Sequence, residues 1–159
     1  MSTKQLIFVH TFAEHIPIPP SSGDYIVCWT AWDVIQHVRL LIRTLGLGDG
    51  IKTAIKVMTG RRKYFVVTDH GEGVHWGWIS ISFCRYYPIQ TGDVVIGPIE
   101  TLPQARGRGF ATFALAKSIN LLIDKGYVEI FIDTAETNYP CLKVIKNCQF
   151  GDPIGSFYK

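Results

Sequence analysis

The chain has 159 residues, of which 47% are hydrophobic and 18% are charged, and its formal net charge is +3. This length and balance exclude a disordered chain and predict a single globular domain over residues 1–159, large enough to bury a stable core. The small positive charge gives no reason to expect nucleic acid as a partner.

The sequence carries no signal for secretion, membrane insertion or metal binding. The apolar stretch at residues 5–9 is too short for the core of a signal peptide, and no apolar run approaches the roughly 20 residues that cross a membrane. The cysteines form no CxxC pair and no cluster with histidine; they are Cys28, Cys84, Cys141 and Cys148. We therefore expect reduced thiols, no bound metal, no membrane insertion and a cytoplasmic location.

The first part of the chain predicts a strand, a loop and a helix. Residues 4–12 alternate loosely between apolar and polar types, as a strand does. Residues 16–23 contain prolines, which lack a backbone donor, and they predict a loop. Apolar side chains then recur at helical spacing from residue 31 to residue 45, and Gly46 ends the pattern.

A pair of neighbouring strands is predicted next. Residues 64–68 and 74–83 are rich in β-branched and aromatic types and flank a turn at residues 70–73. Alternation along the second strand places Val74, Trp76 and Trp78 on one face. We expect the two tryptophans to pack in the core rather than to offer a stacking surface for a sugar ring.

The second half of the chain predicts an alternation of strands and helices. Residues 93–102 are apolar enough for a buried strand, in which Gly97–Pro98 marks a bulge or a break in pairing. Residues 110–122 carry a helical stripe, residues 127–133 read as another buried strand, and Asn138 opens a second helix. This order predicts an α+β (mixed α/β) fold with early antiparallel strands and a parallel crossover around the first of these helices.

The turn at residues 104–109 (QARGRG) is the most informative feature of the sequence. Gly107 and Gly109 remove side chains from the turn, so successive backbone N–H groups can converge on an anion. The helix that begins there adds its positive dipole end, while Arg106 and Arg108 add full charges. The turn therefore predicts a ligand that carries phosphate.

A dinucleotide-binding turn is the nearest competing interpretation. Gly107-x-Gly109-x-x-Thr112 imitates G-x-G-x-x-G, and Asp133 follows about 20 residues later. Two points oppose it. Residues 102–106 separate the turn from its strand, and the motif normally opens its domain, whereas this turn lies late in the chain.

The order of strand, anion turn, helix, strand, Asn and helix resembles the GCN5-related N-acetyltransferases. Their signature Q/R-x-x-G-x-G/A is matched by Gln104, Gly107 and Gly109. A second family feature is an Asn that opens the next helix, followed twelve residues later by a Phe, and it is matched by Asn138 and Phe150. The resemblance covers residues 60–155 best. It implies the acyl-CoA N-acyltransferase fold, a mostly antiparallel sheet splayed around one parallel strand pair, with helices on both faces.

The same resemblance implies that acetyl-CoA is the cosubstrate. Pantetheine would lie against the bulged strand like an extra strand, and the turn would hold the pyrophosphate. The implied cofactor-binding residues are Ile99, Thr101, Leu102, Gln104, Ala105, Arg106, Gly107, Arg108, Gly109, Phe110, Ala111 and Asn138.

The implied reaction is direct transfer of an acetyl group to a primary amine of a small molecule in a ternary complex. A backbone N–H in the segment 97–101 would polarise the thioester. We favour Glu100 as the catalytic base over Asp93, with His75 and a water chain as weaker candidates. Glu100 and Asp93 would face opposite sides of an unbroken strand, but a bulge between them resets that parity.

Two departures from the family pattern qualify these expectations. Ile145 stands where many members carry the Tyr that protonates the leaving thiolate, so a general acid is in doubt and a non-catalytic acyl-CoA-binding module is a second hypothesis. Only nine residues follow Phe150, whereas the family commonly has two closing strands, so the second of these is expected to be absent or supplied by a partner chain in a homodimer.

The acceptor is the least specified part of the prediction. The pattern N-x-x-C-x-x-V-I-x-x-C-x-F from Asn138 to Phe150 is similar to a branch associated with bacterial surface-polysaccharide biosynthesis, which implies an amino sugar. A protein lysine or N-terminus, or a sugar hydroxyl that undergoes O-acetylation, would also be compatible with the same cosubstrate site.

Overall fold

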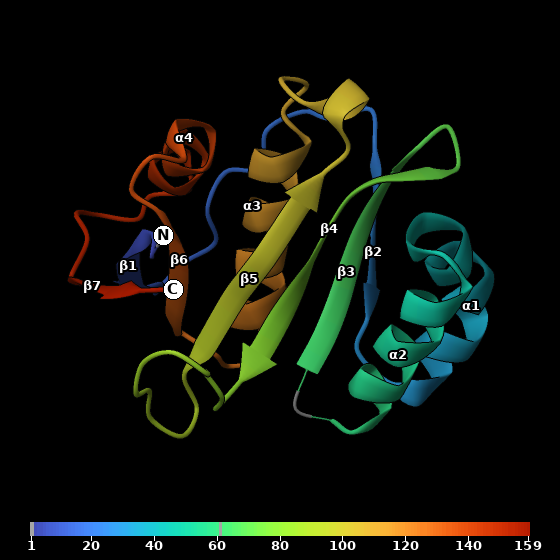
Figure 1. Cartoon of the computed structure of the whole chain (residues 1–159), viewed down its shortest axis with the longest axis horizontal. Coiled ribbons are helices and arrows are strands. Elements are labelled where there is room, and N and C mark those ends of the chain that lie inside the picture. Colours follow the sequence, from blue (N-terminus) through green and yellow to red (C-terminus); the bar gives the residue numbers. More distant parts are fainter. Residues whose placement is uncertain (1, 61) are drawn as a thin grey trace.

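In the computed structural model, which describes residues 2–60 and 62–159, the chain folds into one seven-stranded sheet with four α-helices (Figure 1). The strands are β1 (Lys4–Thr11), β2 (Asp24–Cys28), β3 (Arg62–Asp69), β4 (Glu72–Ile81), β5 (Val94–Thr101), β6 (Glu129–Ala135) and β7 (Gly155–Tyr158). The helices are α1 (Ala31–Leu45), α2 (Leu47–Met58), α3 (Phe110–Asp124) and α4 (Tyr139–Asn147), and a short 3-10 helix spans Pro103–Ala105.

The strand order across the sheet is β2-β3-β4-β5-β6-β1-β7. Only β5 and β6 pair in parallel; every other neighbouring pair in the described part of the chain is antiparallel. Helices α1 and α2 cover one face of the sheet, and α3 and α4 pack in the core on the other face. The predicted mixed α/β fold, with a parallel pair inside a mostly antiparallel sheet, is confirmed.

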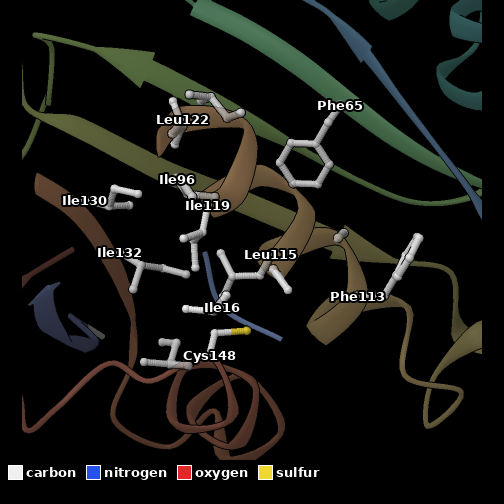
Figure 2. Packing of buried hydrophobic residues seen from close by; sticks show 14 of the residues in the cluster. Ile16, Phe65, Ile96, Phe113, Leu115, Ile119, Leu122, Ile130, Ile132 and Cys148 are labelled. Carbon is white, nitrogen blue, oxygen red and sulfur yellow. The ribbon is translucent and has the colours of Figure 1, made fainter. Parts of the chain in front are cut away.

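Helix α3 is the central element of the larger core. Its sequence is apolar on nearly every side, which suits a helix enclosed by other elements. Leu115, Ile119 and Leu122 are fully buried, and they pack in one cluster with Ile96 of β5 and Ile132 of β6 (Figure 2). The crossover helix is thereby fixed against the two parallel strands, which also fixes where its N-terminal end lies.

Helix α1 begins and ends where local chemistry predicts. The amide of Asp33 donates to the Thr30 hydroxyl at 3.2 Å, and the Asp33 carboxylate accepts from the Thr30 amide at 2.7 Å, which forms a capping box. Gly46 then stops the helix and at once begins α2. The sequence analysis missed α2 and the short strand β2. In α2, Gly50 stands at a buried position where an apolar side chain would be expected. The two helices approach closely at this point, since a Cβ on Gly50 would lie 3.0 Å from the Ile42 Cα of α1.

The predicted bulge in β5 is present at Gly97–Pro98. Gly77 of β4 lies opposite Ile99, whereas Ile79 lies opposite Ile96, so two residues of β5 oppose the single residue Trp78. The parallel ladder with β6 covers only Val94–Ile96. Beyond the bulge, β5 continues to pair with β4 but no longer with β6, so the two parallel strands diverge.

The predicted face of Val74 is wrong. Val74 packs in the cluster around α3, whereas Trp76 and Trp78 pack against the cluster under α1 and α2. Val67 of β3 lies opposite His75, and Thr68 lies opposite Gly73. Val74 is therefore an extra residue of β4 without a partner in β3, and the alternation of faces along β4 is reset there. Both tryptophans are partly buried, in agreement with the expectation that they belong to the core.

One strand, β7, follows α4 in the part of the chain that the structure describes, so one closing strand is present and a second is not seen. Strand β7 pairs antiparallel with β1, with Lys4 opposite Tyr158 and Ile7 opposite Gly155. Strand β1 in turn pairs with β6, so the N-terminal strand lies between the last two strands of the chain.

Burial in the α3 core predicts the effect of a truncation. Replacing the fully buried Ile119 with Ala should lower the free energy of unfolding by about 2–5 kcal/mol, since it removes apolar contacts and leaves a cavity. Ile55 of α2 is 57% exposed, so Ile55→Ala is the matched control and should change it by less than about 0.5 kcal/mol. Urea denaturation measures both values, and equal losses would contradict the packing described.

Candidate active site

A cleft of about 760 Å³ opens where β5 and β6 diverge. It lies between the C-terminal part of β5, the turn before α3, the first turn of α3 and one side of α4. Its lining residues are Ile99, Glu100, Thr101, Ala105, Arg106, Gly107, Gly109, Phe110, Ala111, Thr112, Asn138, Pro140, Cys141, Lys143, Val144 and Asn147. A volume of this size suits a small-molecule or cofactor site.

The turn before α3 presents a row of free backbone donors. Gly107 and Gly109 have φ values of +77° and +83°, which L side chains rarely adopt. The first amide of α3 to be satisfied is that of Phe113, which donates to the Gly109 carbonyl at 3.0 Å. None of the amides from Gly107 to Thr112 has a partner within residues 2–60 and 62–159. Unpaired amides at a helix N-terminus form an anion site.

The two arginines of the turn have different environments. Arg106 lines the cleft, and its Nε donates to the Thr101 carbonyl at 3.4 Å. Arg108 points away from the cleft: its guanidinium contacts the Asp69 carboxylate at 2.7 Å and lies over the Phe110 ring. Asp69, at the end of β3, also accepts a hydrogen bond from Ser22 at 3.2 Å. Arg108 therefore anchors the turn to the β3–β4 hairpin.

Most of the predicted cofactor residues meet in the cleft. Ile99, Thr101, Ala105, Arg106, Gly107, Gly109, Phe110, Ala111 and Asn138 line it. Three do not line it. The amide of Leu102 donates to the Val74 carbonyl at 2.9 Å and its side chain packs against the core, Gln104 is exposed in the 3-10 helix, and Arg108 pairs with Asp69.

Helix α4 contributes a wall that the sequence analysis did not include. Asn138 caps this helix by accepting a hydrogen bond from the Cys141 amide at 3.3 Å, as its predicted position implied. The missed lining residues are Thr112 of α3 and Pro140, Cys141, Lys143, Val144 and Asn147 of α4. Four of these recur at i, i+3, i+4 and i+7 from Pro140, so helical spacing from the cap was the signal that would have found them.

The two candidate carboxylates lie at opposite ends of β5. Glu100 lines the cleft next to Trp76 in the β4–β5 ladder, and it forms no ion pair with any described residue. Asp93 is buried at the start of the strand, where its carboxylate accepts a hydrogen bond from the Gln90 amide at 2.7 Å. The structure therefore gives Asp93 the turn-closing position that ends the β4–β5 connection.

His75 is buried behind the cleft rather than exposed in it. Its Nδ1 lies 2.7 Å from the Thr101 hydroxyl, and its Nε2 has no partner within the described ranges. Burial lowers the pKa of His75 to about 4, so the imidazole is neutral at pH 7. Ile145, at the position of the family Tyr, is also buried, and it packs in the α3 core.

Asp133, the acid of the dinucleotide hypothesis, lies within β6 and does not line the cleft. Burial raises the pKa of its carboxyl, and the Tyr87 hydroxyl donates to it at 3.2 Å. The position that would bind a ribose hydroxyl in a dinucleotide site is thus occupied by a partly buried side chain with a partner of its own.

Within the ranges 2–60 and 62–159, no three His, Cys, Asp or Glu side chains converge as metal ligands would. No helix in those ranges is both long and apolar enough to span a bilayer. The four cysteines are free thiols.

Residues 48–150 match the model of the family described as "Acetyltransferase (GNAT) family". The matched segment is well over half of the chain, and we conclude that the chain belongs to this family of acetyltransferases. The dinucleotide-binding hypothesis is therefore wrong. A comparison with curated protein sequences found no significant match.

Solved structures agree with this fold assignment. A complex of the aminoglycoside N-acetyltransferase AAC(6')-Iy with a bisubstrate analogue superposes with a TM-score of 0.64 at 19% identity, over 87% of this chain and 97% of that one. A GCN5-related N-acetyltransferase from Kribbella flavida (TM-score 0.62, 10% identity) aligns over 98% of this chain and 57% of its own. A tandem GNAT protein from the clavulanic acid biosynthesis pathway superposes with a TM-score of 0.65 at 11% identity, over 99% of this chain and 52% of that one.

The contact between Asp69 and Arg108 predicts a pH-dependent contribution to stability. Hydrogen bonds from Arg108 and Ser22 lower the pKa of the Asp69 carboxyl in the folded state. The stabilisation that the ionised Asp69 carboxylate gives the folded state is therefore fully present above the unfolded-state pKa of about 3.9. It is lost as the pH falls through the lower pKa that Asp69 has in the folded state. The difference in unfolding free energy between the wild type and Asp69→Asn should accordingly shrink below about pH 4.

Urea denaturation at a series of pH values measures this difference. Asp49→Asn is the control, since Asp49 and Lys52 form a highly exposed ion pair of little energetic value. A difference for Asp69→Asn that stays constant across this range would contradict the assignment.

Proposed function

We propose that the protein is an acetyl-CoA-dependent N-acetyltransferase that transfers an acetyl group to a primary amine of a small molecule, by direct transfer in a ternary complex. One observation carries this proposal. The row of unpaired amides from Gly107 to Thr112 borders a cleft that extends to Ile99–Thr101 of β5, beyond the point where β5 stops pairing with β6. A diphosphate at the amides and an extended thioester arm between the strands account for both features.

The residues present fit the parts of acetyl-CoA. The amides and the Arg106 guanidinium are donors for the diphosphate. Ile99, Glu100 and Thr101 follow the end of the parallel ladder at Ile96, so their edge toward β6 is available for the amides of pantetheine. Ala105, Phe110 and Ala111 provide small or apolar surface beside the turn.

The chemistry requires an unprotonated amine and a polarised thioester carbonyl. A backbone N–H of the bulged segment 97–101 is placed to donate to the carbonyl oxygen. Glu100 is the carboxylate in the cleft, and in this mechanism it accepts the proton that the amine loses, directly or through water. Because Ile145 is buried and has no ionisable proton, the leaving thiolate takes its proton from the positively charged nitrogen of the tetrahedral intermediate, or from solvent, as the C–S bond breaks.

The acceptor is proposed by analogy. The AAC(6')-Iy structure was solved with the analogue CoA-S-monomethyl-acetylneamine, in which coenzyme A is joined to an aminoglycoside. An amine carried on a sugar ring is therefore our leading acceptor class, and an amino sugar of surface-polysaccharide biosynthesis is a narrower case of it. A non-catalytic acyl-CoA-binding module is the second candidate, which the buried Ile145 favours. Release of free thiol from acetyl-CoA across a panel of amines and amino sugars separates the two.

The anion turn gives a matched pair of variants. Gly107→Val should weaken acetyl-CoA binding by about 10-fold or more, since a strained and branched residue displaces the amides from the diphosphate. Gly71 has a φ of +79°, close to the +77° of Gly107, and lies in the β3–β4 turn with open space around it. Gly71→Val is therefore expected to lose similar stability while binding normally.

Titration calorimetry measures binding of acetyl-CoA to both variants. Unchanged affinity in the Gly107 variant would refute the placement of the cosubstrate.

The role of Glu100 is tested at the level of turnover. Glu100→Gln should lower kcat by about 10²–10⁴-fold and leave acetyl-CoA affinity nearly unchanged, because only proton transfer is lost. Asp93→Asn changes a carboxylate at the far end of the same strand and should retain kcat. Steady-state rates of thiol release measure both variants. Loss of turnover in the Asp93 variant alone would reverse the assignment.

A further inference from the structure

The α4 side of the cleft carries a positive charge that the proposed reaction does not use. Pro140, Lys143, Val144 and Asn147 share one face of α4 and line the same cleft as the anion turn. Figure 1 shows α4 at the end of the sheet where β5 finishes, the same end as the start of α3. The cleft therefore has two walls, each with its own donors.

The charges lining the cleft are unbalanced. Arg106 on the turn and Lys143 on α4 are the cations among the lining residues, and Glu100 is the acid. Lys143 is exposed and forms no ion pair within the described part of the chain. A ligand that satisfies both walls must carry a second anionic group at a distance from the group bound by the turn.

Coenzyme A carries such a group. Besides its diphosphate, it has a phosphate on the ribose, which dephospho-CoA lacks. The diphosphate already has the six amides from Gly107 to Thr112 and Arg106 as donors. The second wall is therefore available for the ribose end of the molecule, where Pro140 and Val144 give apolar surface beside the cation.

We infer that Lys143 forms a subsite for the ribose phosphate of coenzyme A and makes the protein selective for coenzyme A over dephospho-CoA. This inference rests on the proposed function, because it takes acetyl-CoA as the cosubstrate. Lys143 is a specificity residue on the α4 wall of the cleft, and it takes no part in proton transfer.

Titration calorimetry with coenzyme A and with dephospho-CoA, on the full chain and without an acceptor, tests the subsite. The wild type should bind coenzyme A on the order of 10-fold more tightly than dephospho-CoA, as one charge-assisted contact allows. Lys143→Ala should weaken coenzyme A binding by that factor, leave dephospho-CoA binding unchanged and so abolish the preference. Raised salt should reduce the preference of the wild type, because the contact is ionic and exposed.

Lys146→Ala is the matched control, since Lys146 is an exposed lysine of the same helix that does not line the cleft. It should keep the wild-type preference. Lys143→Gln, which removes the charge and keeps a polar side chain one atom shorter, replaces the Ala variant if circular dichroism shows that the latter is unfolded. Equal affinities of the wild type for the two ligands, or a preference that survives in the Lys143 variants, would overturn the subsite and leave the proposed function standing. Failure of the wild type to bind either ligand would overturn the proposed function itself.

Discussion

The interruption of β5 at Gly97–Pro98 is the constraint on which the rest of the site depends. A strand that continued to pair with β6 would close the sheet and satisfy its own edge. Because two residues of β5 oppose one of β4, the parallel ladder ends at Ile96 and the strands separate. The cleft, the free edge at residues 99–101 and the exposure of Glu100 all follow from this local break in pairing.

The anion turn is positioned from both of its sides. The buried face of α3 holds the helix against β5 and β6, and this fixes the direction in which the free amides point (Figure 2). On the other side, Arg108 holds the turn to Asp69 at the end of β3. One arginine is thus used for structure, which leaves Arg106 as the cation of the turn within the cleft. A turn that contains two glycines is ordered by its neighbours, and its donors are aligned before any ligand arrives.

The features predicted from sequence are those that neighbouring residues determine. The anion turn, the bulge, the limits of α1 and the capping role of Asn138 depend on residue types within a few positions of one another. The features that were missed depend on contacts between distant segments. The pairing of Arg108 with Asp69, the α4 wall and the edge position of β7 depend on the packed fold. The face of Val74 depends on an irregularity in the β3–β4 ladder, where Val74 itself is the extra residue. The different environments of Glu100, which lines the cleft, and Asp93, which closes a turn, also depend on contacts between distant segments.

The place of β1 between β6 and β7 has a consequence for how the sheet folds. Both partners of β1 come from the other end of the described sequence, and the amide of Thr3 donates to the Lys159 carbonyl at 2.9 Å. Contacts of such high sequence separation form slowly, because a long loop must close first. Until β6 and β7 have packed against it, β1 has unpaired ladder groups and exposed apolar side chains, so this end of the sheet is the part most open to wrong pairing during folding.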